Sequence, residues 1–306
     1  MHQSLRGYAV AVLGDIARGP LGEQVAEDLN AVAHLVSRTN SLAVALTDFA
    51  VPTGARRAIL EELLESRVRP EAIRLVLRAV DTERTEEFPT TLHELYELAR
   101  HLHELEGPEF RAEEPIASRT GWRHFMSGYA DAVLESAPDV TELEEIEDEL
   151  FRFARIVESS PTLRDALSDT GQPPESRQGL VSALLEGKAR PATVRLARVA
   201  MQGRVRDVVS SLDWLAEQAA RARGWRIARV RTARPIDDEE QAALAEALQR
   251  ITHHPVELQM TEDATLLGGA VVQIGDLLVD ATAERRLEQL QDHLLKPEGA
   301  TRGAQN

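Results

Sequence analysis

The chain has 306 residues, a net charge of −16 and no cysteine, and its residues are 43% hydrophobic but only 4% aromatic. The length suits two or three domains. Because aromatic residues are few, the cores of these domains must consist of aliphatic side chains. The negative charge disfavours binding to nucleic acid or anionic lipid, and the absence of cysteine excludes disulfides, thiol catalysis and cysteine metal sites. The N-terminal apolar run is too short for a secretory signal, and no run reaches the roughly 18 residues that would span a membrane.

An internal repeat occupies the first two thirds of the chain. The segment GYAVAVL at residues 7–13 returns 121 residues later as GYADAVL at residues 128–134. The same offset, without a gap, pairs the Arg-Pro dipeptide at residues 69–70 with the one at residues 190–191. Two leucine-rich helical segments can resemble each other by chance, but a shared Arg-Pro at one fixed offset indicates a duplication.

The first copy, residues 1–105, is predicted to be a bundle of five or six short helices. Apolar residues recur at helical spacing, and prolines mark helix starts, because proline is tolerated in a first turn. Residues 106–121 contain Pro, Gly, Ser and like charges, which predict a linker. The second copy, residues 122–223, repeats the bundle, with one stripe formed by Leu143, Ile146, Leu150, Phe153 and Val157.

An acidic run in the second copy, ELEEIEDE at residues 142–149, interrupts that stripe. Its spacing predicts the solvated face of an amphipathic helix, and a docking surface for a basic partner is the alternative.

The last third, residues 224–295, changes its period and predicts a small mixed α/β lobe. Residues 225–233 and 256–261 alternate as strands, and Asp237 with Glu240 resembles a capping box between them. Gly268 and Gly269 break the chain, and Gly275-Asp276 forms the two-residue turn of a hairpin. Asp280 or Thr282 is expected to cap a final helix, and residues 296–306 are expected to be a flexible tail.

The overall expectation is a mainly α fold with a C-terminal α/β lobe: two tandem helical bundles followed by a small mixed domain with a β-hairpin. The motifs that could carry chemistry are weak. The glycines at residues 268–275 lack the Lys-Ser/Thr pair of a phosphate loop. His101 and His103 lie two residues apart and do not share a helical face, and the adjacent histidines at residues 253–254 fit a polar turn. We therefore expect no catalytic residue, no metal and no cofactor.

Two aromatic residues occupy equivalent positions in the copies. Tyr8 and Tyr129 both open the sequence Tyr-Ala-x-Ala-Val-Leu. One interpretation is a core aromatic in the first helix of each bundle, and the other is a half-buried tyrosine lining a groove for a partner helix.

Several motifs resemble the delta subunit family of bacterial F-type ATP synthases, which is similar to the mitochondrial oligomycin-sensitivity-conferring subunit. The resemblance covers residues 125–294, and the two departures from the family pattern, Leu267 and Thr282, are conservative. The motifs are Leu267-Gly268-Gly269, Gly275-Asp276, Asp280-x-Thr282, Arg286-Leu287, Val230-x-Thr232-Ala233-x-Pro235-Ile236 and Tyr129-Ala130-x-Ala132.

The resemblance implies a non-catalytic stator, peripheral at the cytoplasmic face of the plasma membrane. In this family the helical domain binds N-terminal segments of alpha subunits, and the C-terminal domain holds b-type stalk subunits. The alpha segment lies between the first and fifth helices. In the second copy this position carries over to Tyr129, Val133, Leu196, Val199 and Ala200.

The extra N-terminal copy departs from a plain delta subunit and is similar to an insertion in some actinobacterial enzymes. Our hypothesis is that its own groove, with Tyr8, Val12, Leu75 and Ala79, binds a second alpha N-terminus. A spacer or a contact with b remains open. The competing classes are a metal hydrolase using His101 and His103, and a free-standing helical adaptor that docks partner helices.

Overall fold

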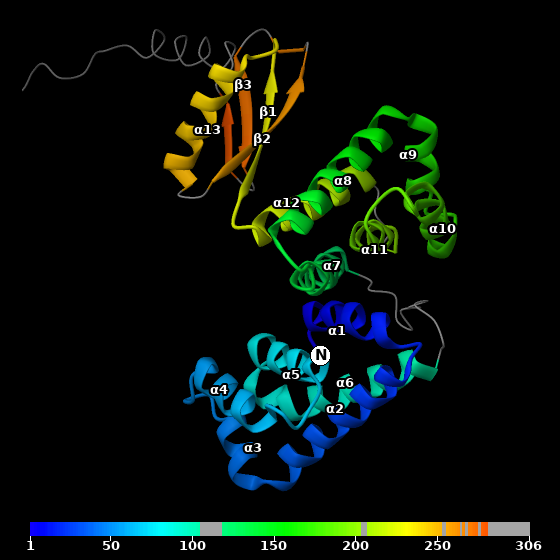
Figure 1. Ribbon diagram of the computed structural model, residues 1–306, viewed down its shortest axis with the longest axis vertical. Helices are drawn as coiled ribbons and strands as arrows, with labels where there is room; N and C mark the ends of the chain where they lie inside the picture. The colour runs from blue at the N-terminus through cyan, green and yellow to red at the C-terminus, as the bar shows by residue number, and fades with distance from the viewer. Residues whose placement is uncertain are drawn as a thin grey trace, which may run out of the picture. The chain divides into compact units, whose positions relative to one another are not determined.

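The computed structural model forms two compact units, Met1–Ala219 and Ala220–Asn306 (Figure 1). The first unit is built from helices, and the second contains the sheet, which confirms the expected mainly α fold with a C-terminal α/β lobe. Both helical copies lie within the first unit, except for residues 220–223 at the end of the second copy. The structure describes residues 1–104, 118–202, 207–252, 255–263, 265–266, 269–274 and 277–280.

The helices of the two copies correspond in length and position. The helices α3 and α9 have eight residues each, and α4 and α10 have twelve each, which supports a duplication. The first copy comprises α1 (Gln3–Ile16), α2 (Pro20–Arg38), α3 (Asn40–Thr47), α4 (Thr53–Leu64), α5 (Pro70–Thr82), the 3₁₀ turn η1 (Thr85–Glu87) and α6 (Phe88–Glu104). The second comprises α7 (Arg119–Glu135), α8 (Val140–Ser159), α9 (Pro161–Ser168), α10 (Pro174–Leu185), α11 (Pro191–Ala200) and α12 (Val208–Ala222).

The start of α7 differs from the expected linker boundary. Residues 119–121 form its first turn, because the hydroxyl of Ser118 accepts a hydrogen bond from the Gly121 amide at 2.9 Å and caps the helix. The rest of the expected linker up to residue 117 lies outside the described residues.

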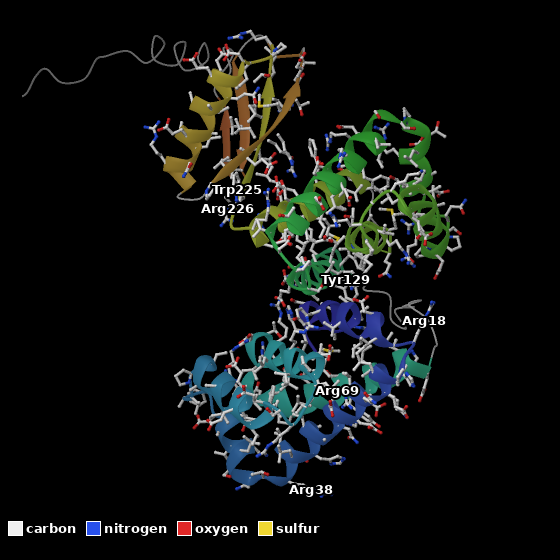
Figure 2. All side chains as sticks on the ribbon, viewed as in Figure 1. Arg18, Arg38, Arg69, Tyr129, Trp225 and Arg226 are labelled. Atoms are coloured by element: carbon white, nitrogen blue, oxygen red, sulfur yellow. The ribbon has the colours of Figure 1, made fainter. Side chains whose placement is uncertain are left out.

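The shared Arg-Pro dipeptides start α5 and α11 in the same way. Asp28 accepts the Arg69 backbone amide at 3.0 Å, and Glu149, its repeat equivalent, accepts the Arg190 amide at 2.9 Å. The following proline needs no amide partner at the first helical position. Asp28 on α2 and Glu149 on α8 therefore fix where the fifth helix of each copy begins. Figure 2 labels Arg69 at this junction.

We expect Asp28→Ala to lower the free energy of unfolding by roughly 1–3 kcal/mol. The half-buried Arg69 amide would lose its acceptor, and the Arg69 guanidinium would lose its ion pair. Glu27→Ala, an exposed acid one residue earlier on α2, is the matched control and should change stability by less than about 0.5 kcal/mol. Urea unfolding measures both variants, and equal effects would contradict the role given to Asp28.

The acidic run of α8 is paired within its own copy. Glu142 lies 2.7 Å from the Arg190 guanidinium, Glu145 also pairs with Arg190, and Asp148 pairs with Arg152. The predicted apolar stripe between these residues is buried in the core, which confirms an amphipathic helix. The contacts with Arg190 tie α8 to the start of α11.

The C-terminal lobe has a four-stranded sheet in the order β2-β1-β3-β4. Strand β1 pairs with β2 in parallel, and helix α13 connects these two strands. Strand β1 also pairs with β3 in antiparallel orientation, and β3 and β4 form the predicted hairpin. The elements are β1 (Arg226–Thr232), α13 (Asp238–Thr252), β2 (Val256–Glu262), β3 (Ala270–Ile274) and β4 (Leu277–Asp280).

Local details of this lobe follow the sequence. Asp237 accepts the Glu240 amide at 2.8 Å and Glu240 accepts the Asp237 amide at 3.2 Å, which confirms the capping box. Gly269 has a positive φ of 83°, which glycine adopts freely. Ile274 pairs with Leu277. The predicted turn residues Gly275 and Asp276, together with Gly268 and everything after Asp280, lie outside the described residues.

Candidate partner-binding surfaces

The residues predicted to line the two grooves lie on α1 and α5 in the first copy and on α7 and α11 in the second. Tyr129 is half-buried, and the others are all buried: Tyr8, Val12, Leu75, Ala79, Val133, Leu196, Val199 and Ala200. The sequence and the family resemblance predict apolar grooves for partner helices at these positions. In the structure each groove is covered by the first helix of the other copy.

The helices α1 and α7 lie side by side (Figure 1). They cross at two glycines, Gly7 and Gly128. A β-carbon added to Gly7 would lie closer than 3.0 Å to the backbone carbonyl of Phe125, and one added to Gly128 would lie equally close to the carbonyl of Ser4. Gly7 and Gly128 are repeat equivalents, and so are Ser4 and Phe125. The contact is therefore reciprocal, as in the interface of a two-fold symmetric dimer.

The first helix of each copy forms an ion pair with the fifth helix of the other copy. The residues that form the two pairs are not repeat equivalents. On α5, Arg78 donates to Asp131 of α7, and on α11, Arg195 donates to Asp15 of α1. Arg195 also donates to the carbonyl oxygen of Ala11 at 3.1 Å. Burial raises the pKa of Asp15 and of Asp131, and the paired arginines partly offset that effect. The fifth helix of each copy thus holds the first helix of the other.

Tyr8 shows how closely α7 covers the first groove. Its ring is 2% exposed, its hydroxyl donates to Glu135 of α7 at 2.7 Å, and the Arg78 guanidinium lies 5.1 Å from its centroid. Burial raises the pKa of Tyr8 well above its ordinary value of 10.0, and the hydrogen bond to the Glu135 carboxylate raises it further. Both effects oppose loss of the phenolic proton.

We expect Tyr8 to make the free energy of unfolding fall more steeply as the pH rises in the alkaline range. Because the unfolded chain releases this proton near pH 10.0 and the folded chain holds it, the stabilisation is complete below that pH and is lost above it. The slope is up to about 1.4 kcal/mol per pH unit. Tyr8→Phe should remove that slope above pH 10.0. Urea unfolding between pH 8 and 11 measures the slope for the wild-type chain and for the variant, and equal slopes would contradict the burial of Tyr8.

Tyr129 borders a pocket that remains between α1, α7 and α11. The pocket has a volume of about 80 Å³, and its lining includes Val10, Ala11, Val199 and Arg198. A cavity of roughly 150 Å³ is needed to hold a benzene ring. This space therefore admits a side chain or a few waters and is too small for a partner helix.

The histidines considered for metal binding have other contacts. The ring Nδ1 of His103 lies 2.9 Å from the carbonyl oxygen of Ala17, which joins the end of α6 to the end of α1. Among the described residues no three His, Asp or Glu side chains are grouped to hold a metal ion. The adjacent histidines at residues 253–254 lie outside those residues.

Comparisons with known proteins agree with the motifs. A model of the family described as ATP synthase delta (OSCP) subunit matches residues 5–107 and 126–294, so that both copies and the C-terminal lobe fall within matched stretches. The chain belongs to this ATP synthase delta (OSCP) subunit family. ATP synthase subunit delta of Frankia alni is 36% identical over 275 residues, which cover 89% of this chain and 88% of that protein. The Salinispora tropica subunit delta is 34% identical over 299 residues, covering 96% and 98%.

Membership of the delta (OSCP) family gives the chain its general role. Subunits of this family are structural parts of the peripheral stalk of F-type ATP synthases, so the chain is a non-catalytic subunit of that stalk. Of the helices in the described ranges, none combines the length and apolarity that crossing a membrane requires.

The reciprocal crossing is the feature that sequence reasoning missed. In the repeated Gly-Tyr-Ala motif the tyrosines are the residues predicted to bind a partner, whereas the glycines Gly7 and Gly128 allow the close approach of α1 and α7. A glycine inside a helix costs stability unless a close contact requires it. Its presence at the same place in both copies was the available signal.

Proposed function

We propose that this subunit joins N-terminal segments of the alpha subunits to the ends of b-type stalk subunits, at the cytoplasmic face of the plasma membrane. It thereby resists the torque that rotation transmits to the catalytic head during proton-driven ATP synthesis. The observation that carries the proposal is the family match over both helical copies and the lobe. The curated relatives that support it match along nearly their whole length and are named ATP synthase subunit delta.

The proposed alpha site of the second copy consists of Tyr129 and Val133 on α7 with Leu196, Val199 and Ala200 on α11. An amphipathic segment placing apolar residues every three or four positions suits such a groove. In the first copy the corresponding proposal is Tyr8 and Val12 on α1 with Leu75 and Ala79 on α5. Two grooves on one chain would strengthen attachment through effective concentration.

The C-terminal lobe is proposed to hold b. Its core is made by apolar residues of the sheet and of α13, which makes the lobe a body of its own: Ala228, Val230, Leu248, Val256, Val272 and Ile274. A rigid lobe transmits force between partners without needing a catalytic group. The alternative, a free-standing adaptor unrelated to ATP synthesis, predicts other partners.

The experiment is affinity purification of the tagged full-length chain from solubilised membranes of its own organism. We expect alpha and b-type subunits to co-purify in stoichiometric amounts. Recovery of the chain without either subunit would overturn the proposal, and recovery with unrelated helical proteins would support the adaptor.

The proposed grooves are tested by binding of a synthetic peptide from the alpha N-terminus. We expect Tyr129→Ala to weaken binding by roughly tenfold or more, since aromatic anchors at such interfaces contribute about 2 kcal/mol. Tyr96→Ala, on α6 and outside both proposed grooves, is the control. A stoichiometry of one peptide per chain that Tyr8→Ala leaves unchanged would rule out the first-copy groove.

A further inference from the structure

We infer that the two copies block each other's docking grooves and that both grooves open together when α1 separates from α7. The inference rests on the proposed function, and it adds a regulatory step to it. The helix α1 forms one wall of the first groove and covers the second, and α7 does the reverse. A single crossing therefore controls two binding surfaces.

The contacts that must break are the same for both grooves. Covering of the first groove depends on Phe125 against Gly7, on Asp131 paired with Arg78 and on Glu135 bonded to Tyr8. Covering of the second depends on three contacts of matching kind: Ser4 against Gly128, Asp15 paired with Arg195, and the Ala11 carbonyl bonded to Arg195. Because α1 and α7 are each rigid helices, separating them at one end of the crossing weakens both sets.

Coupled opening predicts cooperative binding. The first partner segment must bear the free-energy cost of separating the copies, and the second meets a groove that is already open. Apparent affinity falls by the fraction of molecules that are open, and the loss is recovered when opening is complete. The isolated subunit would thus bind single alpha segments weakly and would bind firmly where two are presented together on one catalytic head.

Substitutions at two glycines are expected to separate α1 from α7 while leaving each helix intact. Alanine at Gly7 and Gly128 would place β-carbons against the partner backbone, yet alanine is a better helix former than glycine within each bundle. Gly14→Ala is the matched control, because a β-carbon there has nothing within 4 Å although it lies on the same α1 helix. Arg78→Gln is a second, non-steric variant that removes a cross-copy ion pair.

The readout combines distance and binding on the full-length chain. Because the chain has no cysteine, spin labels at Glu62→Cys and Ala183→Cys, exposed equivalent positions on α4 and α10, report only the separation of the copies. The ligand is a synthetic peptide of roughly 20 residues from the alpha N-terminus, long enough to form a helix when bound.

For the wild-type chain and for Gly14→Ala we expect two peptides per chain, a Hill coefficient above 1, and a longer label distance at saturation. For Gly7→Ala/Gly128→Ala we expect a long label distance without peptide, roughly tenfold tighter binding and a Hill coefficient near 1. Arg78→Gln should shift all three quantities in the same direction by a smaller amount.

Two results separate failure of this inference from failure of the proposed docking. Peptide binding to the wild-type chain with an unchanged label distance, or equal affinity in the opened variants and Gly14→Ala, would overturn coupled opening and leave the docking role standing. An opened variant whose labels are far apart but which binds no peptide would remove the docking role itself.

Discussion

The double substitution Gly7→Ala/Gly128→Ala is expected to lower the unfolding free energy of the first unit by up to about 4 kcal/mol. Two added methyl groups against packed backbone cost roughly 2–6 kcal/mol together, and the better helix propensity of alanine returns about 2 kcal/mol. Urea denaturation followed by circular dichroism measures the change. The loss is limited by the free energy of the crossing, since the helices can separate instead of distorting.

The control for this result is Gly14→Ala. It gains the same helix propensity without a clash and should raise the unfolding free energy by about 0.5–1 kcal/mol. The useful prediction is the opposite sign of the change in the double variant and in Gly14→Ala, which lies on the same α1 helix as Gly7. If both variants stabilised the chain, α1 and α7 would not be in backbone contact, and the account of the crossing would be wrong.

The second large effect is expected from Phe125→Ala. Phe125 is fully buried on α7 and stacks on Trp122 with ring centroids 5.3 Å apart, so truncation should cost roughly 3–5 kcal/mol. In a unit of this size that corresponds to a fall in Tm of roughly 6–20 °C. Phe49→Ala, at a residue that is 91% exposed, should change stability by less than about 0.5 kcal/mol.

The same measurement shows whether the copies unfold as one body. Phe88 is buried in the first copy, and Phe88→Ala should shift the same thermal transition as Phe125→Ala, because both copies belong to one compact unit. Separate transitions, each sensitive to only one of the two substitutions, would show that the crossing contributes little to stability.

Much of the fold was predictable because local signals agreed with one another. The offset that pairs the two Arg-Pro dipeptides placed α5 and α11 correctly, and alternation in residues 225–233 identified β1. Asp237 and Glu240 form the predicted capping box. In each case the residues that carry the signal are within a few positions of the structure they specify.

The arrangement of the copies was not predictable in the same way. Whether Tyr8 faces a partner or the second copy depends on a contact with Glu135, 127 residues away, and no periodicity within α1 distinguishes these possibilities. Apolar residues on both walls of a groove look alike whether the groove is open or covered. Gly7 and Gly128 indicate a close helix crossing, but the sequence does not say that the two helices that cross are α1 and α7.

The reciprocal crossing gives a physical reason why a stator subunit with two proposed docking grooves would have two copies of the helical bundle. A subunit that presented two open apolar grooves before assembly would expose surface that favours aggregation. Under the proposed docking role, copies that cover each other would keep that surface buried until partner segments bind. The chain has a net charge of −16, which further favours solubility of the unassembled subunit.

The most direct test of the account is a density map of the intact ATP synthase that contains this chain. We expect helical density of alpha N-terminal segments against Tyr129 and Val199 and against Tyr8 and Leu75, with α1 and α7 separated. A map in which α1 still packs on α7 through Gly7 and Gly128, with the alpha segments bound elsewhere on the chain or not at all, would contradict it.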